Sequence, residues 1–131
     1  AVGSLGSTQI SSLGVGTAAS GTTGEIRATN NVTAYYSSDE RLKDNVQVIA
    51  NALAKVLQIR GVEFDWNDKA DSVNTGHDFG VIAQEILDIL PEAVKQRDTG
   101  YLAVRYDRII PLLVEAIKDL NKEIKELKSK K

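Results

Sequence analysis

A heptad pattern near the C-terminus constrains the fold of this 131-residue chain more than any other feature. Isoleucines recur every seven residues and leucines do the same, which gives the 3-4 alternation of an a/d seam. The seam residues are Ile110, Leu113, Ile117, Leu120, Ile124 and Leu127. Residues 107–131 are therefore predicted to form one amphipathic helix, which either packs on its own domain or associates with other copies of the chain.

The length and composition of the seam bear on this choice. It spans fewer than three heptads, whereas about three to four identify a coiled coil by pattern alone. A domain this small nevertheless gains much by sharing its core with other copies, so we favour self-association. Isoleucine at a with leucine at d intrinsically favours two strands.

The first 37 residues differ from the rest in composition. Glu25 and Arg27 are their only charged residues, and Gly, Ser and Thr fill 17 of the first 36 positions. A flexible linker has this composition. Apolar residues nevertheless recur between the turn formers, as in short strands of fibrous β-structure, at Ile10, Val15, Ile26, Val32, Tyr35 and Tyr36. Composition alone leaves both interpretations open.

Residues 38–106 are predicted to form a compact α/β unit. One helix face is indicated by Val46, Ile49, Leu53, Val56 and Leu57. Alternating apolar residues in 61–66 indicate a half-buried strand. The segment 79–90 suits a strand entry and a helix stopped at Pro91, and 93–106 suits a hairpin turning at Gly100. The predicted fold class is thus α+β, with a small α/β domain between a β-structured end and a long coiled-coil-like helix.

Several classes of function are excluded or disfavoured by composition. Formal charge is −2 and basic residues are scattered, so no nucleic-acid partner is predicted. The chain has no cysteine, and no apolar run of membrane-spanning length. No cofactor is predicted. No metal is predicted either, because the aspartates at 65, 68 and 71 lack the remaining ligands and the glycine of a calcium loop.

Five short motifs occur in a recognisable order. They are "SSDERLKDNV" at 37–46, "GVEFDW" at 61–66, "GVIAQEI" at 80–86, "LPEAV" at 90–94 and the terminal amphipathic helix. Together they resemble the C-terminal intramolecular chaperone of bacteriophage tailspikes and tail fibres, the endosialidase-type self-cleaving domain (peptidase family S74). The resemblance covers residues 37 to about 127.

This resemblance implies a life history for the chain. Residues 1–37 would end a β-rich fibre shaft, 38–106 would be the chaperone unit and 107–131 the oligomerisation helix. The partners would be two further copies, in a homotrimer, and the upstream shaft of the same chain. The protein would be made in the bacterial host cytoplasm, cut between Ser37 and Ser38, and separated into a shaft that stays in the virion tail and a released chaperone. The trimer disagrees with the two strands that the heptad residues favour.

The resemblance also assigns a catalytic pair, Ser38 as nucleophile and Lys43 as its base. A lysine acts as a base only where burial or nearby positive charge lowers its pKa, and Arg41 is the candidate neighbour, whereas Asp39 would act in the opposite direction. Asn45 is a candidate oxyanion donor. The simplest reaction is attack by Ser38 Oγ on the Ser37 carbonyl, within one chain or between subunits. Because a spacing of five residues is not one face of a helix, a turn or an irregular helix start is expected.

Competing interpretations remain for each of these residues. Ser38 also suits a helix N-cap, since two acids follow it. A triad with His77 is possible on paper, although that histidine is expected in an exposed loop. Gly80, Gln84 and Glu85 suit either packing or contact with the shaft. The alternative function is a non-cleaving trimerisation or receptor-binding tip, and a general protease acting on other chains is disfavoured because no residue set for a substrate pocket is recognisable.

Overall fold

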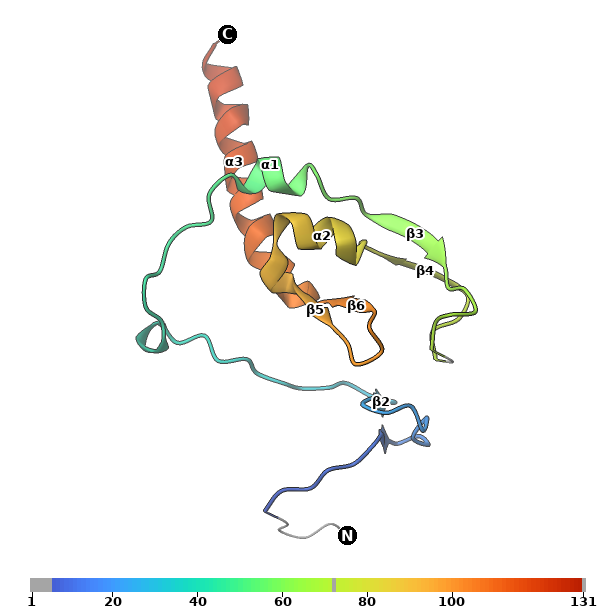
Figure 1. The fold of residues 1–131 in the computed structure, drawn as a ribbon. Helices are drawn as coiled ribbons and strands as arrows, with labels where there is room; N and C mark the ends of the chain where they lie inside the picture. Colours follow the sequence, from blue (N-terminus) through green and yellow to red (C-terminus); the bar gives the residue numbers. More distant parts are fainter. Residues whose placement is uncertain (1–5, 72, 131) are drawn as a thin grey trace. The chain divides into compact units, whose positions relative to one another are not determined.

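The protein consists of short β-pairs, short helices and one long C-terminal helix (Figure 1). The computed structural model describes residues 6–71 and 73–130. Two compact units are distinguished, residues 1–42 with 65–76, and residues 43–64 with 77–131. This division follows packing and does not coincide with the three regions predicted from the sequence. The α+β class is confirmed, while the trimer and the coiled coil remain predictions.

The first unit contains a parallel pair of strands, β1 (Leu13–Val15) and β2 (Ile26–Ala28). Leu13 pairs with Ile26, so the chain returns to the same strand direction after a short connection. Gly16, Gly21 and Gly24 in this connection all have positive φ, which glycine adopts without a Cβ clash. The described part of this region therefore contains short strands, as the interpretation of it as β-structure predicted. It is not a structureless linker throughout.

Two further segments belong to the first unit. The 3-10 helix η1 spans Glu40–Leu42. In the loop 65–76, Trp66 N–H donates to the Gly76 carbonyl at 3.0 Å, and Ala70 N–H donates to the Asn67 carbonyl at 3.1 Å. These bonds give the predicted polar loop a defined turn structure.

In the second unit the predicted strand, helix and hairpin all form. The strand β3 (Val62–Asp65) alternates half-buried and exposed side chains and pairs with β4 (His77–Gly80). Helix α2 (Ala83–Ile89) ends just before Pro91, which starts the 3-10 helix η2 (Pro91–Ala93). The strands β5 (Val94–Gln96) and β6 (Leu102–Val104) form an antiparallel hairpin, and Gly100 in its turn has φ 88°.

The helix predicted from 46 to 57 is wrong in length. Only α1 (Ala52–Val56) is helical, because Asn51, within the predicted span, has a φ of 56°. This left-handed conformation cannot continue a right-handed helix. Val46 therefore lies outside the helix. Val46 and Leu57, both predicted on the buried face, are 72% and 76% exposed.

The core of the second unit consists of two clusters that meet the start of the last helix. The 3-10 helix η3 (Tyr106–Arg108) leads into α3 (Ile109–Ser129). Leu112 and Ala116 of α3 bury Ala52 of α1. Ile109 packs with Ile86 of α2 and Ala93 of η2. One stripe of α3 therefore holds the domain together through its first two turns.

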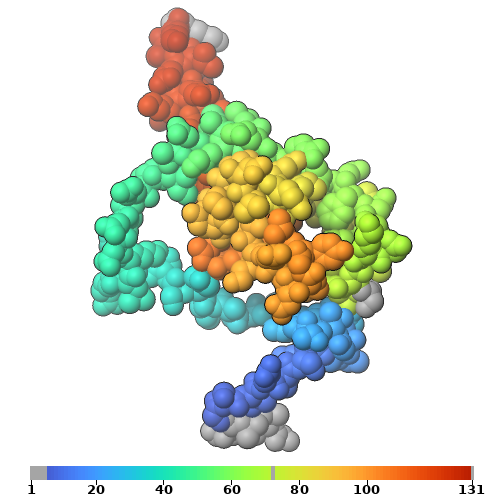
Figure 2. All heavy atoms as spheres, in the orientation of Figure 1, coloured from blue at the N-terminus to red at the C-terminus, as the bar shows by residue number. Residues whose placement is uncertain are grey.

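The heptad seam of α3 is not that stripe. Its side chains are between 42% and 67% exposed, at Ile110, Leu113, Ile117, Leu120, Ile124 and Leu127. Figures 1 and 2 show the C-terminal part of α3 extending beyond α1. The helix thus has two apolar stripes, one buried within the chain and one open. Within the described part of the chain, no helix has the length and apolar character that crossing a membrane requires.

Helix α1 is capped from α3. Its own Asn51 makes no side-chain capping bond, and the Leu53 N–H donates to Asp119 Oδ2 at 3.2 Å. A carboxylate at a helix N-terminus satisfies an unpaired N–H and interacts favourably with the helix dipole. Asp119 is therefore a capping residue supplied by a distant part of the sequence.

We expect Asp119→Ala to lower the free energy of unfolding by about 1 kcal/mol, a value common for lost helix caps. The measurement is chemical denaturation followed by circular dichroism at one fixed protein concentration. Lys125→Ala, on the exposed outer face of α3, is the matched control. Equal midpoints for the two variants would contradict the capping role.

Candidate active site

The segment that contains the predicted catalytic pair is a single tight turn. Ser38 precedes η1 and Lys43 follows it. The turn is closed by the Leu42 N–H, which donates to the Asp39 carbonyl at 3.1 Å. A regular helix does not form here. This agrees with the expectation from the spacing, because residues five positions apart, such as Ser38 and Lys43, would not lie on one face of a helix.

Asp39 caps this turn. Its Oδ1 accepts a hydrogen bond from the Arg41 N–H at 2.8 Å, the bond expected of an aspartate that starts a turn. The sequence predicted Ser38 for this capping role as the alternative to catalysis. At η1 this bond comes from Asp39, and the choice between capping and catalysis for Ser38 stays a prediction.

Arg41 is paired with the same carboxylate. Its Nη2 lies 2.9 Å from Asp39 Oδ2 and its Nε lies 3.1 Å from Asp39 Oδ1, a bidentate pair. The hydrogen bonds that Arg41 donates to Asp39 raise the pKa of Arg41. The pair presents little net positive charge to its surroundings, which weakens the predicted role of Arg41 in activating a lysine.

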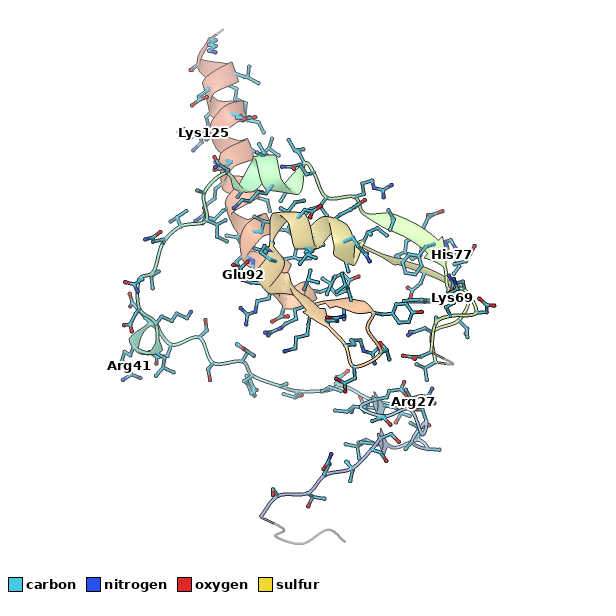
Figure 3. All side chains as sticks on the ribbon, viewed as in Figure 1. Arg27, Arg41, Lys69, His77, Glu92 and Lys125 are labelled. Carbon is cyan, nitrogen blue, oxygen red and sulfur yellow. The ribbon has the colours of Figure 1, made fainter. Side chains whose placement is uncertain are left out.

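The whole segment 38–48 is exposed in the single chain. Figure 3 shows Arg41 on the long connection between β2 and α1. Along the chain, the boundary between the two units falls after Leu42. Ser38 therefore belongs to the first unit and Lys43 to the second. Asn45, the predicted oxyanion donor, has positive φ, which explains an asparagine at this position through backbone conformation alone.

His77 is in a strand and not in the loop predicted for it. It is the first residue of β4 and is labelled in Figure 3. Its Nε2 lies 4.0 Å from Glu63 Oε1, and its ring meets the Phe79 ring edge to face, with the ring centroids 5.5 Å apart. These contacts are those of a partly exposed sheet residue. Among the described residues, no group of three or more His, Asp or Glu side chains is placed to hold a metal ion, the aspartates of the loop after β3 included.

Gly80 and Glu85 both have packing roles. A Cβ on Gly80 would lie 2.7 Å from Tyr106 Oη, and the Val81 N–H donates to that same hydroxyl at 3.3 Å. Glu85 Oε1 accepts from Arg60 Nε at 2.8 Å, and this bond raises the pKa of Arg60. Gln84 is exposed. The packing interpretation is therefore supported for Gly80 and Glu85, and contact with a shaft stays a prediction.

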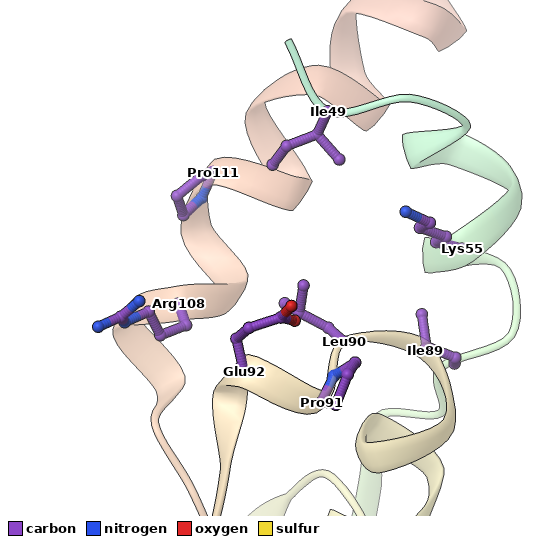
Figure 4. Close-up of a pocket in the computed structure, with 8 residues that line it drawn as sticks. All are labelled: Ile49, Lys55, Ile89, Leu90, Pro91, Glu92, Arg108 and Pro111. Carbon is purple, nitrogen blue, oxygen red and sulfur yellow. The ribbon is translucent and has the colours of Figure 1, made fainter. Parts of the chain in front are cut away.

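A hollow of about 440 Å³ lies elsewhere in the second unit, and sequence reasoning did not foresee it. It is lined by Ile49, Lys55, Ile89, Leu90, Pro91, Glu92, Arg108 and Pro111 (Figure 4). In Figure 4, Lys55 and Glu92 reach towards its centre, whereas Arg108 points away. No local sequence signal marks it, because its walls come from α1 and the residues before it, α2, η2, η3 and α3.

Two exposed features of the chain stand out together. A small α/β unit carries an open apolar helix stripe, a surface typical of interaction sites, and an exposed Ser-Asp-x-Arg-x-Lys turn precedes this unit. Residues 38–95 match the family described as chaperone of endosialidase, and the chain belongs to that family. The match starts at Ser38 and ends within β5.

Relatives of the chain are phage tail fibre proteins. It is 38% identical over 114 residues to the long tail fiber protein Gp37 of Enterobacteria phage K3, covering 82% of this chain and 9% of that protein. The same protein of phage T2 is also 38% identical over 114 residues, with 82% and 8% covered. That of phage M1 is 34% identical over 103 residues, with 72% and 40% covered. The chain thus spans about a tenth of the length of the K3 and T2 relatives.

Proposed function

We propose that this chain is the self-cleaving intramolecular chaperone of a phage tail fibre. It trimerises, aligns the three shafts for folding, and releases itself by cleavage between Ser37 and Ser38. The observation that carries the assembly role is the open stripe of α3, because an exposed apolar face of this length favours association with copies. The family match and the named fibre relatives support the fibre context and a place in the virion tail for the shaft.

Ser38 and Lys43 are proposed to perform the cleavage. Ser38 Oγ attacks the Ser37 carbonyl carbon, and Lys43 Nζ, in its neutral form, takes the hydroxyl proton. The C–N bond to Ser38 breaks, and its nitrogen leaves with that proton as a free α-amine. Water then hydrolyses the resulting Ser37 ester, giving a carboxylate and the original Ser38 hydroxyl. The start of the family match at Ser38 supports this boundary.

Assembly is proposed to switch the reaction on. A lysine ammonium loses its proton near neutral pH only when burial or positive charge disfavours the charged form. In the single chain the segment 38–48 is exposed, and Arg41 is already paired with Asp39. Burial must therefore come from neighbouring copies or from the shaft. Cleavage would then follow folding, and the fold would supply proximity and orientation.

The alternative function is a non-cleaving trimerisation or receptor-binding tip. Two observations favour it: the exposure of the site in the single chain, and relatives that are named as fibre proteins and not as proteases. Both proposals share the association through α3. They differ in whether the chain is cleaved, and therefore in whether the mass of the mature protein depends on Ser38 and Lys43.

We expect the assembled parent protein to yield two pieces, residues 1–37 and 38–131, measured as intact masses under denaturing conditions. Ser38→Ala and Lys43→Ala should stay whole, because each lacks one partner of the reaction. Ser37→Ala is the matched control, since only its backbone carbonyl takes part, and it should still cleave. An assembled parent that stays whole would favour the non-cleaving tip.

A further inference from the structure

Asp39, one residue beyond the serine at the proposed cleavage point, accepts four hydrogen bonds from the turn that follows it. Its Oδ1 accepts from the Arg41 N–H at 2.8 Å and from Arg41 Nε at 3.1 Å, and its Oδ2 accepts from Arg41 Nη2 at 2.9 Å. Its carbonyl accepts from the Leu42 N–H at 3.1 Å. We refer to Asp39, Arg41 and these four bonds as the clamp.

The clamp holds a turn that packing does not hold. No residue of η1 is buried, and Leu42 is 75% exposed. The side chain of Arg41 is 88% exposed, and ion pairs this exposed contribute little to the stability of a fold. The main effect of the clamp is therefore to restrict the backbone of residues 39–42, in a segment that is exposed throughout.

We propose that Asp39 and Arg41 are positioning residues for the cleavage between Ser37 and Ser38. This inference rests on the proposed self-cleavage and adds the contacts that orient its nucleophile. Ser38 is the only residue between the bond to be cut and the clamped turn. A fixed Asp39 therefore leaves fewer conformations to the Ser38 hydroxyl and to the Ser37 carbonyl. Orientation gained before the reaction lowers the barrier of the chemical step.

The clamp divides the preparation of the site between the fold and assembly. It lies within residues 1–42, so the first unit contains all of it. Assembly would then supply the burial that deprotonates Lys43. The clamp also accounts for an arginine at position 41. A bidentate pair with Asp39 needs the planar guanidinium, whereas activation of a lysine would need only a positive charge.

Substitutions that keep every charge separate positioning from electrostatic activation. Asp39→Glu moves the carboxylate one methylene further from the backbone, and Arg41→Lys removes the planar guanidinium. We expect each to slow cleavage about tenfold, the effect of freeing roughly one residue of backbone. Glu40→Asp is the matched control and should cleave like the parent, because the Glu40 side chain takes no part in the clamp. Asp39→Ala should be about a hundredfold slower, and Asp39→Asn, which keeps an oxygen for the Arg41 N–H, should recover about tenfold of that loss.

The measurement is the rate of cleavage by the full chain as a function of pH. Chains isolated unfolded and uncut are diluted into buffers of increasing pH, and samples are quenched at intervals. Intact mass gives the cut fraction and sedimentation gives the assembled fraction. Asp39→Glu and Arg41→Lys should cleave more slowly at every pH with an unchanged midpoint, because the charges around Lys43, those of Glu40 and Asp44 included, are all kept. A profile that is only shifted along the pH axis would assign the effect to the proton on Lys43 and overturn the proposal.

Two further results separate the clamp from the cleavage itself. Rates are compared per assembled chain, so a variant that assembles less still tests the clamp. Asp39→Glu and Arg41→Lys chains that cleave at the parent rate overturn the clamp alone. A parent that assembles and stays whole overturns the proposed cleavage, and the clamp with it.

Discussion

Replacing Ile117 with aspartate is expected to turn the assembled protein into a folded monomer. Ile117 is at the centre of the open stripe and 67% exposed, so the single chain tolerates the change. If copies associate through this stripe as proposed, every copy of the variant would bury a carboxylate beside those of its neighbours, which is strongly unfavourable. The lost burial of an isoleucine already corresponds to about a hundredfold weaker association.

The same variant connects assembly to cleavage. If neighbouring copies bury the Ser38–Lys43 segment, the Ile117→Asp monomer should remain uncut, although Ser38 and Lys43 are both intact. Lys125→Asp, which places the same charge on the outer face, should stay assembled and be cut like the parent. Sedimentation and intact mass are the two measurements. A monomer that still cleaves would contradict the requirement for neighbours, and an undisturbed oligomer would contradict the role of the stripe.

The elements predicted correctly are those whose signal is local. The seam of α3 has its own period, and the hairpin around Gly100 needs only two alternating runs and a residue that accepts positive φ. The helix expected from residue 46 is shorter than predicted. Ile49, Leu53 and Val56 of its pattern do pack on the core, but Asn51 adopts a left-handed backbone conformation within the predicted span. An apolar pattern states which side chains favour burial and does not reveal where the backbone interrupts a helix.

The position of the candidate site could be predicted from the sequence. The hydrogen bonds around it and the burial of its lysine could not. The motif marks Ser38 and Lys43, whereas a choice between Ser38 and Asp39 as the cap depends on where the turn begins. Burial of the lysine depends on contacts beyond one chain, for which local sequence has no signal. The cap that Asp39 provides at η1 was missed because the serine before it suits the same role. The cap from Asp119 at α1 was missed because Leu53 and Asp119 are far apart in the sequence.

Leu112→Ala is expected to lower the stability of the fold, whereas the same substitution at the neighbouring Leu113 is expected to weaken association. Leu112 is fully buried between Ala52 and Ala116, in the cluster that joins α1 to α3. Truncating a buried leucine leaves a cavity and costs about 2–5 kcal/mol. Since small domains are stable by only about 5–15 kcal/mol, this change should melt the second unit tens of degrees lower or leave it unfolded.

Leu113→Ala is the matched variant, one position along on the open stripe and 42% exposed. It should keep the circular dichroism spectrum of the parent and lose association, whereas Leu112→Ala should lose the spectrum itself. Thermal unfolding in dilute solution, where copies separate, measures the loss of folding stability alone. Sedimentation measures the loss of association. Equal losses of fold in both variants would mean that the two stripes of α3 are not distinct. Separate losses would mean that one helix both completes its own domain and presents a surface to its neighbours.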